Sequence, residues 1–287
     1  MKYLRPTLFI AVACLLVNLS VIAQKPSGKL TLAKGQQIQL ENNLKTITTM
    51  DMMGTPMEMT ADASMLHSIE VKDKKQSSFI LSSTMTKLKS NISAMGQAQS
   101  FDSDKPEDLS NETGKMMKGV LNVPKEVELN SDGKIINSQQ DSSSLTAGAG
   151  MMQALQGMMG GAMNDGSGAA EAFLVIPAGK KQGDNWSDSL VSDEMKIYRN
   201  YTLKEINGNK ATVTIDGKQL TNKKVEQMGM EVNVTLDAKL TGETVVNVSS
   251  GIIEQKTFSM EGTGAAEMMG QSIPMTTKFT SAVTVKK

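Results

Sequence analysis

The 287 residues carry 30 Lys and Arg against 30 Asp and Glu, so the chain lacks the basic excess that nucleic-acid binding requires. Its one cysteine is Cys14 and its one histidine is His67, which excludes most disulfide, thiolate-zinc and histidine-based catalytic schemes. Methionine is over-represented, with 23 residues against six Phe, three Tyr and one Trp.

The N-terminus reads as a secretory signal peptide over residues 1–23. A positively charged start precedes an apolar run from Leu8 to Val21, and the small residue Ala23 stands before the expected cleavage point. No later run is apolar enough to predict a membrane span. We therefore expect an exported, periplasmic or extracellular protein. A lipid anchor at Cys14 is an alternative, but the apolar run continues beyond Cys14, which a lipoprotein does not need.

Residues 36–71 predict one long β-hairpin. On the first arm the even positions from Ile38 to Met52 are mostly apolar, and after Gly54-Thr55-Pro56 the odd positions from Met57 to Val71 share one face. Such alternation is typical of an antiparallel ribbon with one dry and one wet side. Both arms exceed the usual strand of about 5–6 residues, so the sheet must coil or bulge. The alternation places the candidate acidic side chains on the solvent-exposed face: Asp51, Glu58, Asp62, Glu231 and Asp237.

The next part of the chain also has strand patterning. In residues 78–94 the apolar positions do not keep to one face of the strand, which predicts a β-bulge. Residues 97–103 predict a further strand with Phe101 facing inward. An Asp-Gly pair predicts a hairpin turn between strands 123–130 and 134–138.

Helical structure is expected only in the middle of the chain. Pro106 followed by two acidic residues favours a helix start, because negative charge suits the positive N-terminal end of a helix. Segment 141–172 is rich in Gly, Ala, Ser and Met. Within it residues 151–163 predict a soft, methionine-lined helix or flap, since each glycine costs about 1 kcal/mol relative to alanine.

The C-terminal part repeats the strand pattern. We predict strands at 197–206 and 210–215, a turn at Asp216-Gly217, and a long strand at 225–241. Further strands follow at 244–248 and 252–260, and the last strand places Ile273, Met275, Phe279, Val283 and Val285 inward.

These elements predict a mainly β fold. We expect a long, strongly curved antiparallel sheet, an incomplete or half barrel, with one or two helices from the central segment. Residues 24–140 and 173–287 would build one domain, with 141–172 as a flexible or helical insert.

Methionine on the apolar face allows two interpretations beyond simple core filling. Unbranched thioether side chains adapt to varied apolar ligands, which predicts a ligand cavity. Thioethers are also soft donors suited to Cu(I) or silver, which predicts a metal site. The candidate cavity lining is Leu40, Leu44, Met50, Met52, Met57, Met59, Met65, Val232, Val234, Leu236 and Phe279. The candidate metal ligands are Met50, Met52, Met57, Met59 and His67.

Several turn motifs together resemble a known group of proteins. They are Lys34-Gly35 before the first strand, Leu129-Asn130-Ser131-Asp132-Gly133-Lys134-Ile135, Ile176-Pro177, Gly183-Asp184-Asn185-Trp186, Tyr201-Thr202-Leu203 and Ile206-Asn207-Gly208. The chain resembles uncharacterised exported bacterial proteins of a domain-of-unknown-function family. Their pattern is in turn similar to periplasmic lipoprotein-carrier and LppX-like half-barrels. The resemblance implies an apolar-ligand cavity and supplies no catalytic residues.

The sequence favours a non-enzymatic binding protein. It contains no phosphate-binding glycine loop, nucleophile elbow, zinc-protease or calcium-loop motif, and no cofactor is expected. The leading hypothesis is an exported protein that holds an apolar small molecule, such as a lipid or acyl chain. The alternatives are a soft-metal binding protein and a structural or surface interaction protein with a packed core.

Overall fold

The computed structural model describes residues 25–52, 54–94, 96–138, 168–227, 230–268 and 270–286. The predicted signal peptide and most of the predicted insert at 141–172 lie outside these residues. The strands are β1 (Gln37–Met52), β2 (Thr55–Lys74), β3 (Ser78–Ala94), β4 (Gln97–Asp102), β5 (Pro124–Asn130), β6 (Ile135–Ser138), β7 (Asn185–Val191), β8 (Met195–Asn207), β9 (Lys210–Gln227), β10 (Met230–Asn247), β11 (Ile253–Met268) and β12 (Gln271–Lys286). Two short helices, α1 (Pro106–Ser110) and α2 (Glu112–Met117), follow β4, and a 3₁₀ turn, η1 (Ala169–Ala172), precedes β7.

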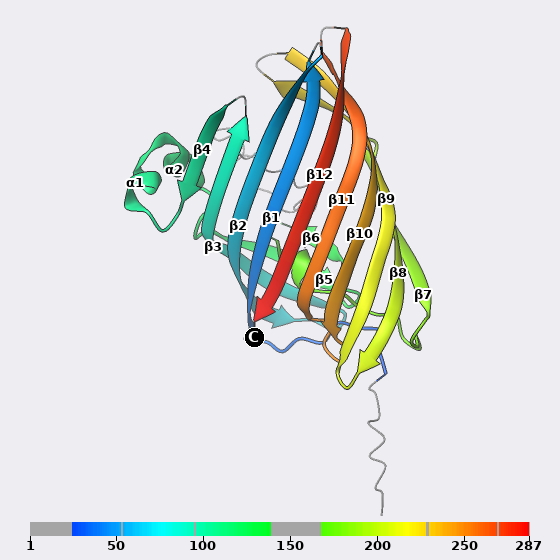
Figure 1. The fold of residues 1–287 in the computed structure, drawn as a ribbon. Coiled ribbons are helices and arrows are strands. Elements are labelled where there is room, and N and C mark those ends of the chain that lie inside the picture. Colours follow the sequence, from blue (N-terminus) through cyan, green and yellow to red (C-terminus); the bar gives the residue numbers. More distant parts are fainter. Residues whose placement is uncertain are drawn as a thin grey trace, which may run out of the picture.

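All these strands form one antiparallel sheet of twelve strands, which stays open. Its order is β6-β5-β3-β2-β1-β12-β11-β10-β9-β8-β7, with β4 also paired to β3. The first and last long strands are neighbours in the middle, so the two halves of the chain share one continuous sheet (Figure 1). The predicted curved, mainly β fold is confirmed. Among the described residues, no helix is both long and apolar enough to cross a membrane.

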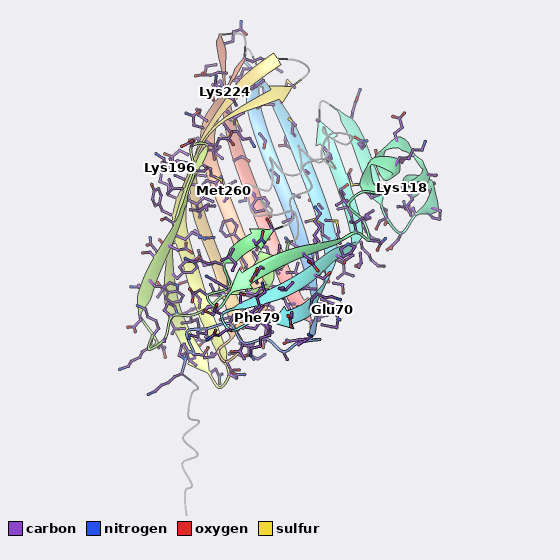
Figure 2. The ribbon with its side chains drawn as sticks, turned by 180° about the vertical axis from the view of Figure 1, so that it is seen from behind. Glu70, Phe79, Lys118, Lys196, Lys224 and Met260 are labelled. Atoms are coloured by element: carbon purple, nitrogen blue, oxygen red, sulfur yellow. The ribbon has the colours of Figure 1, made fainter. Side chains whose placement is uncertain are left out.

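The sheet has one apolar and one polar face, as the alternation predicts. On β1 the side chains of Ile38, Leu40 and Leu44 are buried, whereas Gln39 and Asn43 between them are exposed. The sheet is curved, with the β5–β6 hairpin on its concave side (Figures 1 and 2), and there Leu129 of this hairpin packs with the buried Leu81 and Val283. The apolar face is therefore the concave one. Ion pairs between neighbouring strands cover the convex face, including Lys45–Asp62, Lys218–Asp237 and Lys278–Glu261.

The two ends of the concave face differ. The β1–β2, β3–β4, β9–β10 and β11–β12 connections lie at one end, here called the tip end, and the opposite end is the base end. At the base end the β5–β6 hairpin lies across the concave face (Figure 2). There it packs with the N-terminal segment and η1 over a core that includes Leu30, Ile38, Ile69, Leu81, Leu129, Phe173 and Val283.

The β5–β6 hairpin can cover the base end because β3 pairs with different strands along its length. Its first part, Ser78–Thr84, pairs with β5, and its last part, Lys89–Ala94, pairs with β4. The predicted β-bulge lies between these parts, where the register with β2 shifts between Leu66 and His67. A bulge strengthens local twist, which lets β5 leave the plane of β4.

The prediction for the C-terminal strands was wrong at one turn. Asp216-Gly217 lies inside β9, and the predicted single strand 225–241 is divided between β9, which ends at Gln227, and β10, which begins at Met230 and pairs antiparallel with β9. A side chain at Gly217 would collide with the carbonyl oxygen of Tyr198 on β8. Glycine is therefore present for a close backbone approach rather than for a turn. The predicted strand at 244–248 is the end of β10.

Candidate functional site

Partly exposed apolar side chains line the concave face at the tip end. They come from β1, β2, β3, β10 and β12, and we call them the tip-end apolar band: Met50, Met57, Met59, Ile92, Val234, Leu236, Ile273 and Met275. Each is intermediate in exposure, in contrast to the buried apolar side chains of the same strands nearer the base end. The described part of the chain thus leaves apolar surface accessible on a concave face.

The predicted lining residues fall into two groups. Met50, Met57, Met59, Val234 and Leu236 belong to the tip-end apolar band. The others for which a side chain is described are buried in the protein: Leu40, Leu44, Met65, Val232 and Phe279. Leu44, Met65 and Phe279 pack in a core with Leu88, Phe101, Met117, Leu240 and Met260. This second group supports the sheet and offers no surface to a ligand. Met52 ends β1, and its side chain lies outside the described part of the structure.

The predicted metal ligands are not brought together as a set. Met50 lies opposite Met57, but Met59 lies opposite Thr48, and His67 lies opposite Leu40. His67 is ten residues beyond Met57 on the same strand, roughly 33 Å along it. The imidazole is 1% exposed. The prediction that His67 joins the methionines is therefore wrong, because ten residues of extended strand separate His67 from Met57.

His67 has a packing role in the interior of the protein. The ring lies against Gly168, where an added Cβ would stand 3.1 Å from Cε1 and 3.2 Å from Nε2. Among the described residues, no group of three or more His, Cys, Asp or Glu side chains could hold a metal ion.

Polar side chains on β7 and β8 interrupt the apolar concave face. Arg199 donates from Nε to Oδ1 of Asp188 at 2.7 Å and from Nη2 to Oδ2 at 3.0 Å. Tyr201 donates its hydroxyl to Oδ2 of Asp188 at 3.1 Å, and its ring stacks on Trp186 with centroids 5.3 Å apart. Burial raises the pKa of the Tyr201 phenol, against the opposing effect of the Arg199 charge, and Asp188 raises it further. The phenol therefore remains a donor at neutral pH.

A second ion pair lies on the same face. Lys256 of β11 donates to Oε2 of Glu171 in η1 at 2.6 Å, with side chains 19% and 15% exposed. Burial lowers the pKa of Arg199, but Tyr201, Asp188 and Glu171 together raise it above its ordinary value. We call these five side chains the concave ionic cluster: Glu171, Asp188, Arg199, Tyr201 and Lys256. It provides charge and hydrogen-bond donors beside an otherwise apolar surface.

The concave ionic cluster was not predicted from the sequence, although a signal was present. The side chains of β8 that face the concave side are Met195, Ile197, Arg199, Tyr201 and Leu203. Arg199 is thus a charged residue at a position where the alternation predicts an apolar one. Lys256 interrupts the inward phase of β11 in the same way, two positions before Phe258.

A hollow of about 550 Å³ lies on the opposite surface of the sheet. Most of its lining is polar or charged and comes from the convex side: Asn43, Lys45, Asp62, Thr241, Thr257, Ser259 and Thr280. Leu44 is the one predicted lining residue that borders it. The hollow is therefore not the predicted methionine-lined cavity.

Comparison with known proteins places the sequence in a family. The model of a "Family of unknown function (DUF6263)" matches residues 76–253, which is more than half of the chain. The chain belongs to this family. The expected membership of a domain-of-unknown-function family is confirmed. Curated proteins give no match.

Solved structures show a related fold. The chain is similar to lipovitellin, in a structure described as "lipid-protein interactions in lipovitellin", with 12% identity and a TM-score of 0.51. The match covers 90% of this chain but only 26% of that chain, so the DUF6263 protein spans about a quarter of it. An outer membrane channel from Pseudomonas putida F1 matches with 8% identity and a TM-score of 0.25, over 92% of this chain and 100% of that chain. The lipovitellin likeness shows a shared sheet architecture.

Proposed function

We propose that this DUF6263 protein is an exported, non-enzymatic binding protein that holds an acyl chain or lipid against the tip-end apolar band. The observation that carries the proposal is the contrast between the two faces of the same strands. Met57 and Met59 are apolar and partly exposed on the concave side, whereas Glu58 between them is exposed on the convex side. A ligand would remove the concave apolar surface from water, at roughly 25 cal/mol per Å².

The composition of the band suits a flexible ligand. Met50, Met57, Met59 and Met275 have unbranched side chains that repack around different apolar shapes. Ligand sites combine such surfaces with a few polar groups that fix orientation. The concave ionic cluster supplies those groups, because Arg199 keeps N–H donors beyond the two that it gives to Asp188.

The remaining support comes from the resemblances. A lipoprotein-carrier-like half-barrel is expected to hold an apolar ligand on its concave side, and the lipovitellin sheet has a similar architecture in a structure concerned with lipid. The charged start and apolar run of residues 1–23 support export. The absence of catalytic motifs from the sequence supports a binding function without chemistry.

The test compares two adjacent positions on β2. In Met59→Glu a carboxylate enters the tip-end apolar band, whereas in Thr60→Glu it lies on the convex face. Delipidated protein is titrated with a fluorescent fatty acid, and lipids carried through purification are identified by native mass spectrometry. We expect Met59→Glu to weaken binding by about tenfold or more, because an apolar ligand cannot solvate the charge. Thr60→Glu should bind like the wild type. Equal affinity of all three proteins, or no binding by the wild type, would refute the proposal.

A further inference from the structure

Methionines from three neighbouring strands form a row at the tip end. Met50 of β1 lies directly opposite Met57 of β2 on one side and directly opposite Met275 of β12 on the other. All three side chains lie on the concave face and are partly exposed. Sequence reasoning did not place Met275 with the other two, since 225 residues of chain separate it from Met50.

The spacing allows the three sulfur atoms to converge. Adjacent strands lie about 4.8 Å apart, so Met57 and Met275 stand roughly 10 Å apart on either side of Met50. Concave curvature brings inward-pointing side chains closer than their backbones, and long thioether arms can lean toward the central residue. The position beyond Met275 in the same row is Gly264 on β11, where an added Cβ would collide with the carbonyl oxygen of Thr235, so the row of methionines ends at Met275.

On β1 and β12 the described concave-face methionines, Met50 and Met275, lie at the tip end, whereas β2 also carries the buried Met65. Nearer the base end the same face is built from branched residues, with Leu40 on β1, Ile69 on β2 and Val283 on β12. Those residues are buried, so their branched side chains fill the core of the protein. At the tip end the side chains are accessible, and Met50, Met57 and Met275 share both an unbranched shape and a sulfur atom.

The chemistry around the row selects a soft ion. Thioethers are neutral, soft donors that favour Cu(I), whereas calcium, magnesium and manganese prefer oxygen. The acidic residues next to the row in sequence, Asp51 and Glu58, alternate to the convex face and are exposed there. In the next row toward the base, the hydroxyls of Thr48 and Thr277 lie 3.2 Å apart and hydrogen-bond to each other. The described residues thus present sulfur, and not carboxylate, on this part of the concave face.

We propose that Met50, Met57 and Met275 form a three-thioether site that binds one Cu(I) ion. This function is additional to ligand binding by the tip-end apolar band and does not depend on it. The site needs no oxidation or reduction by the protein, because Cu(I) enters and leaves in the same oxidation state.

Replacing methionine with leucine removes the sulfur atom and keeps an apolar side chain of similar volume. The variant Met50→Leu/Met57→Leu/Met275→Leu keeps the volume and the apolar surface of the row, and volume-conserving swaps usually cost little stability. The count-matched control is Met65→Leu/Met85→Leu/Met260→Leu, which removes three buried methionines from the same face. Circular dichroism and thermal unfolding establish that both variants are folded.

The measurement is an anaerobic titration of the full mature protein with Cu(I), in competition with a chromophoric Cu(I) chelator. We expect wild type and control to bind Cu(I) alike, and the row variant to bind at least about tenfold more weakly, since it lacks the soft donors. X-ray absorption of the wild-type complex should show a sulfur shell. Undiminished Cu(I) affinity of the row variant, equal loss in the control, or a shell of nitrogen or oxygen would overturn the inference.

Discussion

Arg199 and Asp188 form a two-point ion pair that joins the edge strand β7 to β8 on the concave face. The guanidinium donates to both carboxylate oxygens, at 2.7 and 3.0 Å, with side chains 37% and 29% exposed. Edge strands expose unpaired backbone groups, and inward-pointing charges are one of the devices that discourage pairing with another chain. The pair therefore stabilises the edge of the sheet as well as supplying polarity to the concave face.

Replacing Arg199 with Met should destabilise the protein. The change keeps most of the apolar stem but removes two charge-assisted hydrogen bonds, which leaves Asp188 with Tyr201 as its remaining donor. We expect a loss of about 1–2 kcal/mol in the free energy of unfolding, less than for a fully buried pair, because water still reaches both groups. Urea unfolding measures the loss, and hydrogen exchange should increase in β7.

A double variant provides the control for this prediction. Arg199→Met/Asp188→Leu removes both charges, so no carboxylate remains half-buried without its cation. Its loss should be smaller than the sum of the two single losses, since the penalty of an uncompensated charge disappears. Additive losses would show that the pair contributes no coupling energy.

Gly168 should be intolerant of a side chain. Its φ of 65° lies in the left-handed region, and an added Cβ would approach the buried His67 ring at 3.1 Å. Gly168→Ala should cost about 1–2 kcal/mol for the backbone, plus the cost of crowding the ring. Gly179 has a φ of 80° with nothing within 4 Å of an added Cβ, so Gly179→Ala isolates the backbone cost. Equal thermal destabilisation of the two variants would contradict a packing role for His67.

The faces of the long strands could be predicted because alternation is a local property. Ile38 and Leu40 on β1, and Ile69 and Val71 on β2, are all buried as their phase predicts. The burial of Phe101 also follows from strand phase. These assignments need no knowledge of which strands are neighbours, since a period of two fixes the side of the sheet.

Turn positions were less predictable, because glycine serves different purposes. At Gly54 and Gly270 a positive φ, 83° and 79°, accompanies a hairpin connection that follows methionine in the sequence. Gly217 instead permits a close approach to the backbone of β8. The dipeptide Asp216-Gly217 has the composition of a turn, and only the pairing of β9 with both β8 and β10 decides against one.

The candidate sites depend on contacts that sequence patterns do not contain. The row of Met57, Met50 and Met275 needs β1 to pair with β12, at opposite ends of the chain. The ion pair of Glu171 and Lys256 needs η1 to lie on the concave side of β11. Such non-local pairing arises only when the whole sheet assembles, whereas the local alternation of each strand already determines which of its side chains point inward.

Glu128 should make the attachment of β5 to β3 sensitive to acid. Its Oε1 accepts from Nζ of Lys75 at 2.9 Å and from Oγ of Ser78 at 2.6 Å. These bonds hold the pKa of the carboxyl below its ordinary value, with the Lys75 bond contributing most. A lowered folded pKa gives stability that is present above the ordinary carboxyl pKa and is lost as pH falls through the folded value. Glu128→Gln should therefore lower the urea midpoint at pH 7 and reduce the further loss between pH 7 and about pH 3.

Glu126→Gln, at an exposed position two residues earlier on β5, serves as the control and should leave both midpoints near those of the wild type. An unchanged acid response in Glu128→Gln would show that these bonds do not help to hold the β5–β6 hairpin over the base end.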